Sequence, residues 1–80
     1  MEVDDKVLAF ALLADHFRTG RVPLAQQEWY VNWINEEPTA AAGMLMCRRD
    51  EPAGMFLNHN VPPASPLEIA ILEAIERGAE

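Results

Sequence analysis

The chain has 80 residues, half of them apolar, and carries thirteen acidic against six basic side chains, for a formal net charge of −7. A chain this short buries only a thin core, so we expect a single compact domain over residues 1–80, for which forming a homodimer would be a natural route to stability. The acid excess argues against direct nucleic-acid binding, because affinity for phosphates depends on clustered Lys and Arg. It favours a protein partner with a basic surface.

The single cysteine, Cys47, can form neither an internal disulfide nor a multi-cysteine zinc motif, which is typical of a reducing, cytoplasmic setting. The N-terminus MEVDDK lacks the basic region of a signal peptide, and the apolar run 7–14 is too short to span a bilayer. We therefore expect a cytoplasmic protein without membrane contact.

A first helix is predicted over residues 2–18. Apolar side chains recur there at the helical period on one side: Val3, Val7, Phe10, Leu13, Ala14 and Phe17. Gly20 follows as the stop. Leu8 and Leu12 lie on the opposite side, so this helix either packs against protein on two sides or offers a small docking surface.

A second helix is predicted after Pro23, with an apolar arc that supplies the aromatic core: Trp29, Tyr30, Trp33 and Ile34. If this helix continued through Glu36 and Glu37, the two acids would lie at its negative C-terminal end, which is unfavourable. We therefore predict that the helix ends earlier and that Asn35 caps a third helix. That helix would carry Glu36 and Glu37 in its first turn and Arg48 and Arg49 in its last, and both charge groups would complement the helix dipole.

Two adjacent stretches, 42–52 and 53–63, share Ala-Gly-Met and a closing proline. The first falls in the third predicted helix, whereas the asparagines and the proline pair of the second favour a loop. The alternative is an α+β fold with a β-hairpin at 44–58 packed on three helices, because EPAG suits a type I turn. Methionine is a poor strand former and neither arm alternates, so we expect an all-α bundle of about four short helices.

The last helix has the clearest local signal, a capping box in Ser65-Pro66-Leu67-Glu68 followed by Gly78 as the stop. Its predicted core face consists of Leu67, Ala70, Ile71, Ala74 and Ile75. On the outer side three acids surround an isoleucine that could serve as a docking point: Glu73, Glu76 and Glu80 around Ile69.

The sequence gives little support for catalysis or for metal binding. His16, Cys47 and His59 stand in no recognised motif, and we interpret Cys47 and His59 as a buried thiol and a loop histidine. Length, charge and helix count resemble those of acyl carrier proteins, but these carry their prosthetic group on the serine of an Asp-Ser-Leu motif. The only serine here, Ser65, is followed by proline. We therefore expect a non-enzymatic protein with no cofactor and no metal.

In size and charge the chain resembles small acidic proteins of phages and other mobile elements, anti-CRISPR proteins among them. Our interpretation is an inhibitor or decoy that acts by protein–protein contact on a basic surface of a nucleic-acid-binding complex. The candidate partner-binding residues are Glu36, Glu37, Asp50, Glu51, Glu73, Glu76, Glu80 and Ile69. The alternative is a helical adaptor or accessory subunit docking through apolar surface, for which the candidates, unless they fill the core, are Met44, Met46, Met55 and Phe56.

Overall fold

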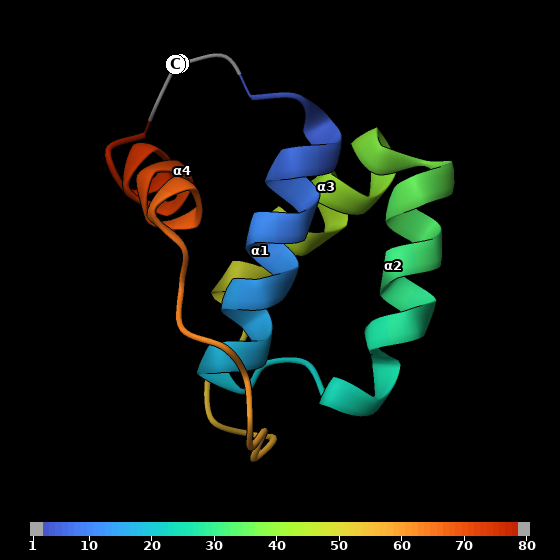
Figure 1. The fold of residues 1–80 in the computed structure, drawn as a ribbon, viewed down its shortest axis with the longest axis vertical. Coiled ribbons are helices and arrows are strands. Elements are labelled where there is room, and N and C mark those ends of the chain that lie inside the picture. The colour runs from blue at the N-terminus through green and yellow to red at the C-terminus, as the bar shows by residue number, and fades with distance from the viewer. Residues whose placement is uncertain (1–2, 79–80) are drawn as a thin grey trace.

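The computed structural model describes residues 3–78, and within them the chain forms a compact all-helical domain without strands. Its elements are α1 (Asp5–Thr19), the 3-10 turn η1 (Leu24–Gln26), α2 (Gln27–Glu36), α3 (Pro38–Cys47), the 3-10 turn η2 (Arg48–Asp50) and α4 (Pro66–Glu76). Figure 1 shows α1 in the middle, with α4 on one side, α2 on the other and α3 behind it. The predicted all-α fold of four short helices is confirmed, and the hairpin at 44–58 is wrong.

Helix α1 is defined by caps at both ends. The Asp4 carboxylate accepts the Val7 N–H at 2.8 Å, so the helix begins at Asp5, later than the predicted start at residue 2, which lies outside the described residues. Gly20 ends the helix as predicted, because its φ of +74° is a left-handed conformation that glycine adopts without strain.

Both sides of α1 are buried, since the helix packs against α2, α3 and α4. Leu12 and Ala9 are fully buried among the core residues, together with Leu13 and Phe17, and Leu8 packs against them. Of the two alternatives for Leu8 and Leu12, packing against protein on both sides is the correct one.

The break between α2 and α3 comes later than predicted. Helix α2 extends through Glu36, and the non-helical residue is Glu37, with φ −140° and ψ 71°. Asn35 as the cap is therefore wrong. The reason is Pro38, which occupies the first position of α3: a proline disfavours helical conformation in the residue before it, so the chain must leave the helix at Glu37.

The core contribution of α2 is narrower than predicted. Tyr30 and Ile34, one turn apart, are buried, whereas Trp29 is 59 % exposed and packs edge-on against the Tyr30 ring at 4.9 Å between centroids. Helix α2 contacts α1 and α3 but has no neighbour on its outer side in the described fold, so only one stripe of its apolar arc meets protein.

Helix α4 begins as predicted, with the Ser65 hydroxyl accepting the Glu68 N–H at 3.2 Å and Pro66 in the first position. Its predicted core face is correct except at Leu67: Ile75 packs against the core, and Ala70 and Ala74 are half-buried. Ile71 is buried, but Leu67 is 53 % exposed, because α4 packs mainly on α1. After η2, residues 51–64 form a loop that leads to this helix.

Candidate partner-binding surface

The first pair of candidate acids lies at the junction of α2 and α3. Glu36 is the last residue of α2 and Glu37 is the single linker residue, and both are exposed. The Glu37 N–H donates to the Trp33 carbonyl at 2.7 Å, and its own carbonyl accepts the Ala41 N–H at 3.0 Å. The backbone that carries this acid is therefore fixed by hydrogen bonds from both helices.

The second pair lies at the other end of α3. Asp50 ends η2 and Glu51 follows it, and both are exposed. Arg48 and Arg49 fall in η2, beyond the last turn of α3 where they were predicted, because the helix tightens into a 3-10 turn at Arg48. The Arg48 guanidinium lies 3.8 Å from the Glu51 carboxylate, a spacing at which an exposed ion pair stabilises little.

The third group of candidates lies on α4. Ile69 is 44 % exposed, and Glu73 and Glu76 are exposed on the same helix, whereas Glu80 lies outside the described residues. Glu76 pairs with Arg49 and so ties α4 to η2. This acid therefore already has a basic partner within the chain.

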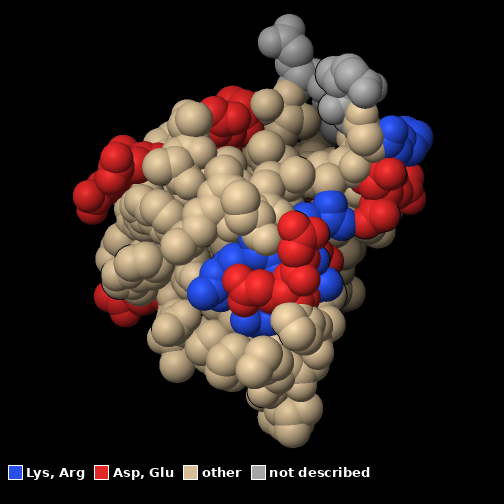
Figure 2. Space-filling view, turned by 180° about the vertical axis from the view of Figure 1, so that it is seen from behind, with Lys and Arg blue, Asp and Glu red and all other residues tan. Residues whose placement is uncertain are grey.

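The surface of α3 itself is uncharged, and the two arginines of η2 follow it before the second acid pair. No residue of α3 carries a charge, and its outer residues are exposed: Thr39, Ala40, Gly43, Met44, Met46 and Cys47. Figure 2 shows this distribution from behind, with tan surface between separate acidic side chains toward the left edge and a mixed group of acidic and basic side chains near the centre. The structure thus separates the candidate acids into small groups on several elements rather than one continuous acidic face.

The burial of one polar residue was not predicted from the sequence. His16 of α1 is fully buried, and its Nε2–H donates to the Leu45 carbonyl at 2.7 Å. This carbonyl lies in the last turn of α3, where helix carbonyls have no N–H partner in the regular pattern, so His16 caps α3 from a neighbouring helix. Its position between Asp15 and Phe17 on an apolar helix was the only sequence signal, and it does not show which helix lies opposite.

The surroundings of His16 shift its titration. Burial lowers its pKa below the ordinary value of 6.5, because the charged imidazolium would be desolvated. The bond to the Leu45 carbonyl and the Asp15 charge act in the opposite direction, while Arg21 and Arg48 add to the lowering. With Nε2 protonated, Nδ1 of the neutral ring is a buried acceptor without a partner in the described part of the chain.

Of the two residues interpreted as a buried thiol and a loop histidine, the cysteine differs from the prediction in its exposure. Cys47, at the end of α3, is exposed rather than buried, since it belongs to the outer face of that helix. His59 is an exposed loop residue, as predicted. Among residues 3–78, no three His, Cys, Asp or Glu side chains lie together so that they could hold a metal ion.

The described helices are all too short or too polar to cross a membrane. Comparisons with protein-family models, with curated proteins and with solved structures found no significant match.

Proposed function

We propose that this protein is a non-enzymatic inhibitor that docks on a basic surface of a nucleic-acid-binding protein in the cytoplasm. The observation that carries the proposal is the arrangement around α3: an exposed, uncharged helix face with Glu36–Glu37 before its first residue and Asp50–Glu51 beyond the two arginines at its other end. A partner that presents apolar surface between basic groups would complement the charges of Glu36, Glu37 and Asp50, whereas Glu51 already pairs with Arg48.

The dimensions of the surface suit a small, specific contact. Helix α3 has ten residues and is therefore about 15 Å long, and the acid pairs beyond its ends lie roughly 20 Å apart. Ala40 and Gly43 are exposed near the middle, and a Cβ added at Gly43 would meet no atom within 4 Å. The backbone of a partner segment can therefore approach α3 closely between the two acid pairs.

Direct binding of nucleic acid has little support from the basic residues. Arg18, Arg48 and Arg49 each form an ion pair with a glutamate, and the Arg21 guanidinium donates to the Glu51 carbonyl at 2.8 Å. Four of the six basic side chains are thus engaged within the chain. With the net charge of −7, this favours a protein that competes with nucleic acid over one that binds it.

The adaptor alternative is also favoured by a specific observation. The four candidates that would otherwise fill the core are all exposed: Met44, Met46, Met55 and Phe56. Methionine adapts its shape to a partner, so these side chains provide an apolar docking surface that does not depend on charge. Ionic strength separates the two functions, because a charge-led contact weakens as salt rises and an apolar one hardly changes.

The test is capture of partners from the lysate of a plausible host at low and then high salt, with identification by mass spectrometry. The identified partner is then assayed with Glu37→Lys and Asp50→Lys, and with Glu28→Lys, an exposed residue of α2, as the control of equal charge change. An inhibitor of the proposed kind binds a nucleic-acid-binding protein, releases it in high salt, and loses at least about tenfold in affinity only with the first two variants. Retention through high salt with no effect of either variant would instead favour the adaptor.

A further inference from the structure

Three consecutive large apolar side chains project from the loop after η2. Met55 and Leu57 are 69 % and 86 % exposed, and Phe56 between them is also exposed. We name residues 55–57 the apolar tip. Their backbone is held in place, because the Gly54 N–H donates to the Thr19 carbonyl at 2.7 Å and the Phe56 N–H donates to the Gly20 carbonyl at 3.0 Å.

Asn58 fixes the other end of the tip. Its side-chain Nδ2 donates to the carbonyls of Phe17 and Val22 at 2.9 and 2.8 Å, and its Oδ1 accepts the Leu24 N–H at 2.9 Å. The tip is therefore a pre-ordered protrusion with apolar side chains in water. Binding through a loop usually costs the conformational entropy that is lost when the loop becomes ordered. Because the backbone of the tip is already ordered, this cost is small here.

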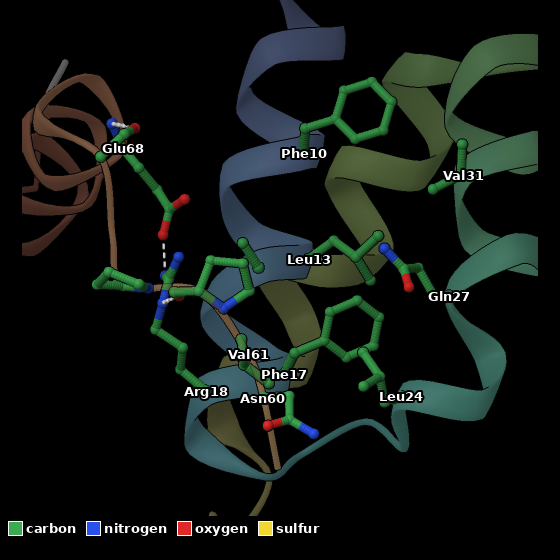
Figure 3. A pocket seen from close by; sticks show the side chains of 14 residues that line it. Phe10, Leu13, Phe17, Arg18, Leu24, Gln27, Val31, Asn60, Val61 and Glu68 are labelled. Atoms are coloured by element: carbon green, nitrogen blue, oxygen red, sulfur yellow. Dashed lines mark hydrogen bonds and ion pairs between the residues drawn. The ribbon is translucent and has the colours of Figure 1, made fainter. Parts of the chain in front are cut away.

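A groove opens a few residues further along the chain. It has a volume of about 550 Å³ and lies between α1, the η1–α2 segment and residues 60–65. Figure 3 shows apolar side chains along both walls: Phe10, Leu13 and Phe17 of α1, with Leu24 and Val31 opposite. Arg18 and Glu68 lie at one edge and are paired with each other. We name this the α1–α2 groove, and it has the size and apolar lining of a binding site.

Charge restricts what can cover these two surfaces. Residues 52–67 contain no Asp, Glu, Lys or Arg, and Figure 2 shows the lower end of the molecule without charged side chains. A basic partner gains nothing from an uncharged surface. A second copy, which carries −7 and is repelled by the acidic groups elsewhere, meets the least repulsion at the uncharged tip and at the groove, where the charged lining residues Arg18 and Glu68 pair with each other.

The tip and the groove are also complementary to each other within one chain. The tip protrudes, the groove is hollow, both are apolar, and only two residues separate Leu57 from Asn60 at the groove. An isologous dimer requires a surface that is its own complement across a two-fold axis, and a neighbouring knob and groove provide one.

We propose that two copies of this chain form a symmetric dimer in which the apolar tip of each inserts into the α1–α2 groove of the other. An interface of standard size covers about 800 Å² on each partner, roughly 15 % of the 5241 Å² that one chain exposes. The core gives an independent reason, because alanines at positions 9, 11, 41 and 42 contribute little apolar area to it. The dimer does not depend on the proposed inhibitory function, since α3 lies outside both surfaces.

Sedimentation velocity over a concentration series tests the dimer. Leu57→Asp alters the tip, and Gln27→Glu places a charge at an exposed position of the groove without disturbing the core. Leu67→Asp is the matched control, because it makes the same change at an exposed leucine of α4 outside both surfaces. We expect wild type and Leu67→Asp to dimerise alike, and the other two variants to raise the dimer dissociation constant at least about tenfold.

Circular dichroism of each variant checks that its helices are intact. Nuclear Overhauser contacts between differently labelled copies then locate the interface, with the Met55 and Leu57 methyl groups of one copy expected near the Phe10 and Phe17 rings of the other. A wild-type chain that stays monomeric at every concentration would overturn the proposal. A dimer that is equally tight with Leu57→Asp, or one with contacts elsewhere, would overturn it as well.

Discussion

Replacement of His16 by leucine removes the one polar side chain that is fully buried in the described core. The Leu45 carbonyl at the end of α3 loses its hydrogen bond, which costs about 1–3 kcal/mol when the group stays buried. Part of this is regained because the unpartnered Nδ1 also disappears. We therefore expect a net loss of about 1 kcal/mol at neutral pH, which lowers the melting temperature of a domain this small by roughly 4–8 °C.

The same residue makes the stability depend on pH. Because burial lowers the pKa of His16 below 6.5, the unfolded chain binds the proton more readily than the folded one. This contribution to stability is complete above pH 6.5 and is lost as the pH falls from 6.5 toward the lower folded pKa, with a limiting slope of about 1.4 kcal/mol per pH unit. The Leu variant lacks this slope and approaches or exceeds wild type at the acidic end.

The measurement is the free energy of unfolding in urea from pH 7.5 down to 5.5, above the range in which ordinary carboxylates titrate. His59→Leu is the control, because it removes the other histidine of the chain, which is exposed in the loop. Should His16→Leu keep the wild-type slope, or should His59→Leu abolish it, the assignment of the acid sensitivity to His16 would be refuted.

Four further substitutions test global and local stability. Gly20→Ala destabilises by more than about 1 kcal/mol in thermal unfolding, because φ is +74° and a Cβ would lie 2.6 Å from the Phe56 carbonyl, whereas Gly43→Ala, in open space within a helix, stabilises by about 0.5–1 kcal/mol. Asn58→Ala costs about 1–3 kcal/mol and raises the hydrogen-exchange rate of the Leu24 amide, since it removes three hydrogen bonds. Arg18→Ala removes the ion pair with Glu68 and the hydrogen bond to the Pro62 carbonyl, which attach α4 to α1. We expect faster amide hydrogen exchange in α4 and an unchanged rate in α1, and an equal increase in both helices would contradict this role of Arg18.

The helix ends could be predicted where the signal is local. Gly20, and Ser65 with its capping box, act on groups within a few residues of themselves, so neighbouring sequence suffices to place them. Asn35 and Pro38 predict different ends for α2, before Asn35 as a cap or at Glu37 as the residue before a proline. The conformational restriction that Pro38 imposes outweighed the dipole preference of the two acids, which is worth only a few tenths to about 1 kcal/mol each.

The composition of the core could be predicted only in part. Periodicity shows that Trp29, Tyr30 and Ile34 lie on one broad arc, but which stripe of the arc is buried depends on where α1 and α3 lie. Leu67 is exposed for the same reason, since α4 has one main neighbour rather than two.

For the candidate surface, the exposure of the acids at both ends of α3 could be predicted from their type. The Arg49–Glu76 ion pair could not, because it joins residues 27 positions apart whose proximity is created by the packing of α4. The hydrogen bond from His16 to the Leu45 carbonyl spans 29 positions and depends in the same way on how α1 packs against α3.

The exposed apolar tip also governs how the protein behaves in concentrated solution. At neutral pH the net charge of −7 keeps molecules apart and limits random contact between their tips. As acid protonates the carboxylates, this repulsion fades, while Met55 and Leu57 of each chain outside a dimer stay apolar and in water. Solubility should therefore fall in mild acid before the helices unfold, and a single acidic residue in place of Leu57 should restore it.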